Sequence, residues 1–290
     1  MISSRNRNRA DWCPEMYSGK NLLINGCLSE FQRGNAGKDG FSADRWRIDG
    51  VSASLKDVSD VPKGYLQGCY LSKTSAGEMF FGQRIEAALS AQSAGENVTF
   101  SFELYDVIGI DKLEVVAYHT SAKDDWSTAS VLFFSEQVAD LASGRKSVVM
   151  PSLPDDVKHG LYVGLKATTS NAGSYKTTGL QLELGDQATR FVPDFPTINL
   201  AKCQRFYQYH NITEVRGFQS AGVIIHHPMM LPVELRALPA VTSTHTVIHR
   251  AAAVEIQALT KSEVIVSITK GTETSDCFVN GMTVSLDAEL

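Results

Sequence analysis

The sequence predicts an all-β protein, a jelly-roll β-sandwich followed by a smaller β domain that one short helix leads. Hydrophobic and polar residues alternate along most of the chain, as in "VTFSFELYDV", and this period of two is typical of strands with one buried and one solvated face. Clusters of Gly, Pro, Asn and Ser separate the alternating segments at short intervals. No strong helical period competes with this pattern, which favours antiparallel sheets.

Length, charge and cysteine content limit the possible functions. The 290 residues suffice for one large or two ordinary domains, at about 150 residues each. The net charge of −5 argues against a nucleic-acid partner, and no apolar run approaches the roughly 18 residues of a membrane span. Five dispersed cysteines without a CxxC pair predict reduced thiols in a protein made in the cytoplasm. Cys13 stays open as a candidate for an intermolecular disulfide.

The first part of the chain divides into an arm and a sandwich. Residues 1–20 are polar, with Arg alternating with Asn, Ser or Ala, and are expected to form an extended arm. Residues 21–192 carry the alternating segments and form the predicted sandwich. Strands are expected to begin near the following residues: Leu22, Arg45, Leu66, Met79, Val98, Leu113, Ser130, Lys146, Leu161 and Tyr175.

The pattern changes after residue 192. Pro193 and Pro196 predict a linker over residues 193–198. The stretch "NLAKCQRFYQYH" then places apolar residues at helical spacing, with Asn199 as the expected N-cap. Alternating segments return after this helix, so residues 199–290 form the predicted second β domain.

The sequence contains no recognisable catalytic or metal-binding motif. GxSxG, HExxH, a P-loop and a GxGxxG in a strand–helix context are all missing. His226 and His227 are adjacent, so they point to opposite faces of a strand, and Pro228 is expected to end that strand. We therefore predict no catalytic residue, metal or cofactor.

Aromatic residues are the candidates for ligand binding. Tyr105, Tyr118 and Tyr162 lie on the polar faces of three predicted strands, where they would stack against the apolar face of a sugar ring. The alternative is that they cover the other sheet or a subunit contact. Trp126, in a predicted loop, is a further glycan-binding candidate, whereas Trp46 is expected in the core.

Several segments resemble a known family when they are taken in order. They are "NLLINGCLSEFQRG" (residues 21–34, called the opening stretch below), "FSADRWRIDG", "FFGQRIE", "GLQLELGDQATRF" and "CQRFYQYH". Together they resemble the carbohydrate-binding-module-like β-sandwich of bacteriophage tail fibre and other virion proteins, over roughly residues 20–290. The resemblance implies a jelly-roll sandwich that starts with the opening stretch as its first strand, a trimeric state and attachment to a virion. It implies glycan binding only loosely, since fold does not dictate function.

The related sugar-binding modules commonly hold a structural calcium ion. They follow "NLLxNG" with an acidic pair, where this chain has Cys27 and Ser29. The last predicted strand also lacks carboxylates at Thr178-Gly179-Leu180. Because calcium prefers carboxylate ligands, we do not expect that site here.

The leading hypothesis is a bacteriophage virion structural protein, a tail fibre or similar appendage for host attachment. It would be made in the host cytoplasm, and residues 1–20 would anchor it to other virion proteins. The sandwich would act in receptor binding to host surface glycans. Residues 199–290, including Phe206 and Tyr207, would form the interface of a homotrimer. The alternatives are a capsid decoration or collar protein with a purely structural role and, less favoured, a glycan-degrading enzyme.

Overall fold

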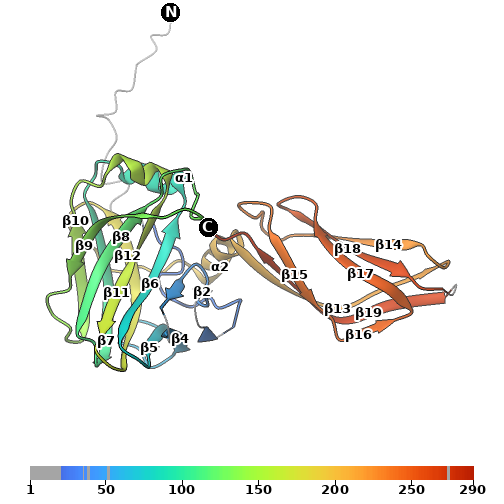
Figure 1. Cartoon of the computed structure of the whole chain (residues 1–290), viewed down its shortest axis with the longest axis horizontal. Coiled ribbons are helices and arrows are strands. Elements are labelled where there is room, and N and C mark those ends of the chain that lie inside the picture. Colours follow the sequence, from blue (N-terminus) through green and yellow to red (C-terminus); the bar gives the residue numbers. More distant parts are fainter. Residues whose placement is uncertain (1–20, 35, 38–39, 51–52, 273–274) are drawn as a thin grey trace, which may run out of the picture.

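The computed structural model describes residues 21–290 except 35, 38–39, 51–52 and 273–274. The expected arm of residues 1–20, with Cys13, lies outside the described residues. The rest of the chain forms a β-sandwich and a smaller β domain beside it (Figure 1). This architecture confirms the predicted all-β jelly-roll class.

Two six-stranded antiparallel sheets form the sandwich. Sheet A has the order β1 (Ala36–Gly37), β4 (Ala53–Val58), β5 (Gly68–Lys73), β12 (Gly173–Leu184), β7 (Val98–Ile108) and β10 (Gly144–Met150). Sheet B has the order β2 (Gly40–Phe41), β3 (Arg47–Asp49), β6 (Gly77–Ile85), β11 (Leu161–Thr169), β8 (Lys112–His119) and β9 (Val131–Gln137). Short helical turns α1 (Ala87–Ser90), η3 (Ala91–Ser93) and η4 (Asp155–His159) complete this domain.

The alternating pattern places one side-chain set of each strand in the core between the sheets. The apolar residues of "VTFSFELYDV" are all buried: Val98, Phe100, Phe102 and Leu104. Trp46 is fully buried and stacks on Phe81 with ring centres 4.9 Å apart. Its indole Nε1 donates to the carbonyl of Asn25 at 3.0 Å, so its polar atom is also satisfied. The prediction that Trp46 is a core residue is confirmed.

The opening stretch is not a strand, and the prediction that it begins the sandwich is wrong. Its backbone turns at Asn25 and Leu28, which have φ values of 57° and 55°. The Asn21 side chain pairs with β12 instead, since its amide donates to the carbonyl of Leu180 and accepts from the amide of Leu182, both at 2.9 Å. Two separate backbone hydrogen bonds accompany this side-chain pairing, from Leu22 N to Leu182 O at 2.9 Å and from Leu180 N to Gly26 O at 2.8 Å. The stretch therefore lies against β12 without forming the continuous ladder that the alternating pattern suggested.

The second domain begins with helix α2 (Pro196–Gln204) and contains two small antiparallel sheets. One joins β13 (Tyr207–Gln219), β19 (Ser275–Asp287) and β15 (Ala240–Thr244), with β16 (Val247–His249) also paired to β19. The other has the order β14 (Ile224–Met230), β18 (Glu263–Lys270) and β17 (Ala251–Ala258). Their inner faces share one small apolar core centred on β18 and β19.

Two details of the second domain differ from the prediction. Helix α2 starts at Pro196 with Phe195 at its N-cap, so Asn199 is not the cap. Asn199 is instead buried inside the helix and hydrogen-bonds Asn25 of the sandwich. Strand β14 continues through Pro228, because it pairs only with β18 and an edge strand tolerates proline.

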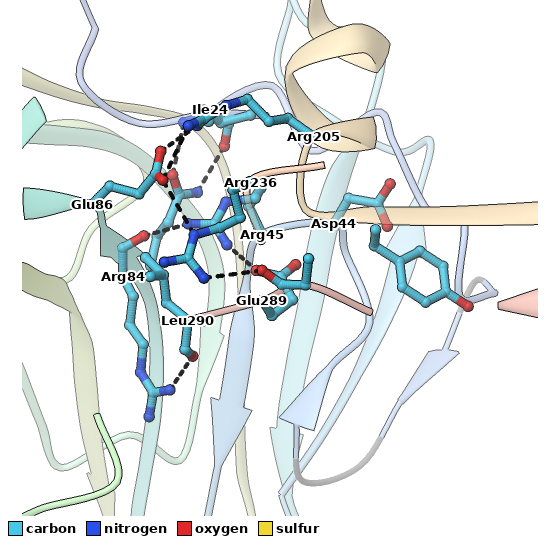
Figure 2. A network of polar contacts seen from close by, with 12 residues as sticks. Ile24, Asp44, Arg45, Arg84, Glu86, Arg205, Arg236, Glu289 and Leu290 are labelled. Carbon is cyan, nitrogen blue, oxygen red and sulfur yellow. Dashed lines mark hydrogen bonds and ion pairs between the residues drawn. The ribbon is translucent and has the colours of Figure 1, made fainter. Parts of the chain in front are cut away.

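Ion pairs with at least one buried partner join the two domains. After β19 the chain returns to the sandwich, and its C-terminal end lies at the junction (Figure 1). There Glu289 forms an ion pair with Arg45, whose side chain is 1% exposed, and a second one with Arg33 at 3.3 Å. Glu86 of the sandwich pairs with Arg205 and with Arg236, the latter at 3.2 Å (Figure 2).

The junction also buries Phe206 and Tyr207, which we expected at an oligomer interface. The guanidinium of Arg45 lies 3.5 Å from the ring centre of Phe206, and that of Arg33 lies 3.7 Å from the ring centre of Tyr207. Both side chains are therefore covered by their own chain, at 1% and 7% exposure. This corrects the expectation, because they present almost no surface to a partner.

No helix in the part of the chain that the structure describes is long and apolar enough to cross a membrane.

Candidate functional site

The outward face of sheet B carries a cluster of four aromatic side chains, called the aromatic face below. Phe80, Tyr162 and Tyr118 come from β6, β11 and β8, and Trp126 comes from the loop after β8. The Tyr162 ring lies at the centre, 4.7 Å from Phe80, 6.1 Å from Tyr118 and 5.8 Å from Trp126. Tyr162 is 7% exposed, whereas the other three are partly exposed. A ligand would thus meet three ring surfaces that are supported by a fourth.

Glycines shape this face. Gly82 and Gly164 are register partners on β6 and β11, in the middle of the sheet. A Cβ at Gly82 would lie 2.6 Å from the Phe80 ring, so the missing side chain lets this ring lie down on the sheet beside Tyr162. At the loop end, a Cβ at Gly160 would come within 3.1 Å of the Trp126 ring. The glycines therefore allow rings from different elements to meet.

Paired charges border the aromatic face. Arg47 pairs with Asp49 at 2.7 Å, and Glu114 pairs with Lys112 at 2.9 Å and with Lys166 at 3.3 Å. Burial by itself would raise the pKa of Glu114, but its hydrogen bonds to Lys112 and Lys166 contribute to holding it below the usual value. These side chains offer charged donors and acceptors that would suit ligand hydroxyls.

Hydrogen bonding also fixes the central ring. The Tyr162 hydroxyl donates to Asp49 at 3.1 Å. Burial raises the pKa of Tyr162 well above its usual value, so the phenol keeps its proton at neutral pH. The central ring is therefore held in one position and remains a neutral surface.

Arg84 lies beside the aromatic face, next to Tyr162 and Trp126. It is the register partner of Tyr162, which is in turn the partner of Tyr118. Its guanidinium carbon lies 5.2 Å from the Trp126 ring centre and 5.3 Å from that of Tyr162. Its Nη1 donates to the main-chain oxygen of Leu290 (Figure 2).

The structure brings together three of the four predicted glycan-binding residues. Tyr118, Tyr162 and Trp126 are neighbours, but Tyr105 lies on β7 in sheet A and is 7% exposed. Lys176 covers the Tyr105 ring, with its Nζ 5.8 Å from the ring centre. The predicted platform of three tyrosines is therefore wrong for Tyr105, which lies on the other sheet.

Sequence reasoning missed Phe80 and Arg84, although a signal was present. In "MFFGQRI", Met79 and Phe81 point to the core, so the period of two sends Phe80 and Arg84 to the outer face. Both residues share that face with Gly82, whose lack of a side chain marks a position of close approach.

Two cavities lie at the junction between the opening stretch and helix α2. They have volumes of about 220 and 180 Å³ and share Asn21, Leu23 and Lys202 in their walls. Asn199, which lines the larger one, is already hydrogen-bonded to the sandwich. In the described part of the chain, no group of three or more His, Cys, Asp or Glu side chains is arranged to hold a metal ion.

No protein-family model matches the sequence, and no curated protein is significantly similar to it. Among solved structures, the chain is similar to the enzymatically active domain of tailspike protein 4 from bacteriophage CBA120, with 13% identity and a TM-score of 0.40. That match covers 57% of this chain and 21% of the tailspike chain.

Two further structures have comparable similarity. The CBM22-1 xylan-binding domain of Paenibacillus barcinonensis Xyn10C is 14% identical, with a TM-score of 0.38 over 59% of this chain and 99% of that one. A putative sugar binding protein from Bacteroides thetaiotaomicron is 12% identical, with a TM-score of 0.38 over 57% and 100% of the two chains. At these identities and TM-scores the similarities assign no ligand and no activity to the chain.

Proposed function

We propose that the protein is a virion appendage protein, such as a tail fibre, and that its aromatic face binds host surface glycans. One observation carries the binding proposal: three partly exposed rings surround the buried Tyr162 on an open sheet, with paired charges along the border. A sugar ring has an apolar face that stacks on aromatic side chains and hydroxyls that hydrogen-bond nearby polar groups. The virion assignment rests on the resemblance of the ordered sequence segments.

Replacing an exposed ring should weaken glycan binding without unfolding the protein. We expect Tyr118→Ala and Trp126→Ala each to lose about 1 kcal/mol of binding free energy, roughly a fivefold rise in Kd. A glycan array with the wild-type protein identifies the probe, and titration calorimetry with that glycan measures the change.

Tyr70→Ala is the matched control for this experiment. Tyr70 is also a partly exposed tyrosine, but it lies on β5 in sheet A beside Lys56. Its replacement should leave the Kd unchanged. Equal losses in all three variants would contradict the assignment of binding to the aromatic face, and a large fall in Tm for Tyr118→Ala would show that its ring is structural.

We also propose that the protein is a homotrimer. With Phe206 and Tyr207 covered by their own chain, this proposal rests on other apolar side chains of the second domain. They are at least 43% exposed: Phe218, Met230, Leu238, Val247 and Ile248. Exposed apolar surface of this kind commonly marks an interface. Light scattering should give three times the chain mass of 31.6 kDa, and a monomer at micromolar concentration would refute the trimer.

The alternative functions predict different results in the same experiments. A capsid decoration or collar protein would assemble into particles and bind no glycan on the array. A glycan-degrading enzyme would release reducing sugar from a host polysaccharide. The anchoring role of residues 1–20 remains a proposal, and incorporation of a protein lacking them into particles would contradict it.

A further inference from the structure

The loop that carries Trp126 is held from both domains through Asp124. The backbone N–H of Asp124 donates to the carbonyl of His159, in η4, at 2.7 Å. The carboxylate of Asp124 accepts from the backbone N–H of Ala87, in α1, at 2.8 Å through its Oδ1. Its Oδ2 lies 3.6 Å from Nη2 of Arg236. The first two contacts come from the sandwich, whereas Arg236 belongs to the second domain and lies between β14 and β15.

Arg236 is itself fixed where it meets the loop. Its Nε pairs with Glu86 at 3.2 Å (Figure 2), and its Nη1 donates to the carbonyl of Ala288 at 3.3 Å. The side chains of Arg236 and Asp124 are only 14% and 18% exposed, so water and salt screen their attraction less than that of an exposed pair. The second domain thus presents a fixed positive charge to the loop.

The position of Asp124 determines where the Trp126 ring lies. Asp124 has a φ of 55°, so the chain turns in the left-handed region two residues before the tryptophan. Residues 121–123 and 127–130 are exposed on either side, so the loop has little packing of its own and depends on contacts such as those of Asp124. Beyond the turn, the Trp126 ring lies 5.8 Å from the ring centre of Tyr162 on the aromatic face.

We propose that Arg236 is a positioning residue for the glycan-binding site, because its ion pair with Asp124 holds the Trp126 ring beside Tyr162. This inference rests on the proposed glycan-binding function and makes that site depend on the second domain. Arg236 acts through the loop and does not contact the sugar. A glycan that stacks on Trp126 binds more tightly when the ring is already in place, because binding then does not have to order the loop.

Asp124→Asn tests the proposal in the full chain. Asparagine tolerates the same positive φ and can still accept the hydrogen bond from Ala87, and Arg236 keeps Glu86 as its counter-charge, so the Tm should be unchanged. With the glycan identified on the array, titration calorimetry should show a Kd raised by up to about fivefold, the whole effect expected of the Trp126 ring. In the Trp126→Ala background the same substitution should have no further effect, because both changes act on one group.

A second measurement reports the position of the ring without any glycan. The chain has three tryptophans, of which Trp46 is fully buried and Trp126 is partly exposed. In a Trp12→Phe background, acrylamide therefore quenches mainly the fluorescence of Trp126. Asp124→Asn should increase this quenching, since a loop without its ion pair exposes the ring more.

Asp125→Asn is the matched control. It removes the same charge from the same loop, but this carboxylate hydrogen-bonds Ser127, so the Kd and the quenching should equal those of the wild type. Unchanged Kd and quenching in Asp124→Asn would overturn the inference, and so would a loss of binding that persists in the Trp126→Ala background. A wild-type protein that binds no glycan would instead overturn the proposed function, while the quenching would still decide whether the ion pair positions the loop.

Discussion

Glu289→Gln should lower the free energy of unfolding by about 3–5 kcal/mol, the usual result of removing one partner of a buried ion pair. Arg45 lies in the sandwich with a side chain that is 1% exposed, and Glu289 is its ion-pair partner. The glutamate side chain is itself 5% exposed. The substitution would leave a buried guanidinium without its counter-charge. Burial lowers the pKa of Arg45 to about 9, because it disfavours the charged form.

Urea denaturation of the full chain measures this effect. Glu214→Gln is the control, because Glu214 pairs with the exposed Arg216 and such pairs contribute about 1 kcal/mol or less. In the Arg45→Met background, Glu289→Gln should be much less destabilising, since no buried charge is then left unpaired. A Glu289→Gln protein as stable as the wild type would show that the junction does not depend on this pair.

The ion pair also couples the two domains. Arg45 belongs to the sandwich, but the carboxylate that neutralises it follows the last strand of the second domain. Arg205 and Arg236 make the reverse contribution, because they come from the second domain and neutralise Glu86 of the sandwich. Each domain therefore supplies charges that the other needs, which fits a single cooperative unfolding transition.

Local patterns in the sequence predicted the sheets but not this junction. The period of two identifies which residues of a strand face the core, and it correctly placed Trp46 and the apolar residues of β7. Arg45 and Glu289 are 244 residues apart, and no local pattern reports a pairing over that distance. The same limit explains the opening stretch, where the pairing of Asn21 with β12 depends on residues some 160 positions away.

In the candidate site, too, the local pattern was predicted correctly but the long-range arrangement was not. Alternation correctly placed Tyr118 and Tyr162 on outward faces, but it does not say to which sheet a strand belongs. Tyr105 obeys the same alternation and lies on the other sheet, because the chain crosses from sheet A to sheet B between β7 and β8. Which outward-facing tyrosines lie together is therefore decided by the order of the strands in the two sheets.

Asp44→Asn should change how stability depends on pH, by up to about 3 kcal/mol between pH 4 and pH 7. Burial raises the pKa of Asp44 from its usual 3.8 to about 6, despite hydrogen bonds from Gln32 and the nearby charge of Arg33. The folded pKa thus lies about two pH units above the unfolded one, and each unit corresponds to about 1.4 kcal/mol. Well below pH 3.8 the carboxyl is protonated in both states and has no effect. As the pH rises towards 6, the folded state binds more protons than the unfolded state, so the wild-type protein loses stability.

The stability difference between wild type and Asp44→Asn, measured by urea denaturation at several pH values, isolates this effect from all other groups. We expect the difference to shift in favour of the asparagine variant from pH 4 to pH 6 and to be constant above about pH 7. Asp44 accepts from the Gln32 side chain at 2.6 Å, and this amide also donates to the carbonyl of Tyr207 at 3.0 Å. A lost hydrogen bond would therefore add a constant offset, which leaves the pH dependence unchanged. If the difference for Asp44→Asn is flat from pH 4 to pH 7, the buried carboxyl titrates as it does in the unfolded chain, and the electrostatic account of the junction is wrong at this residue.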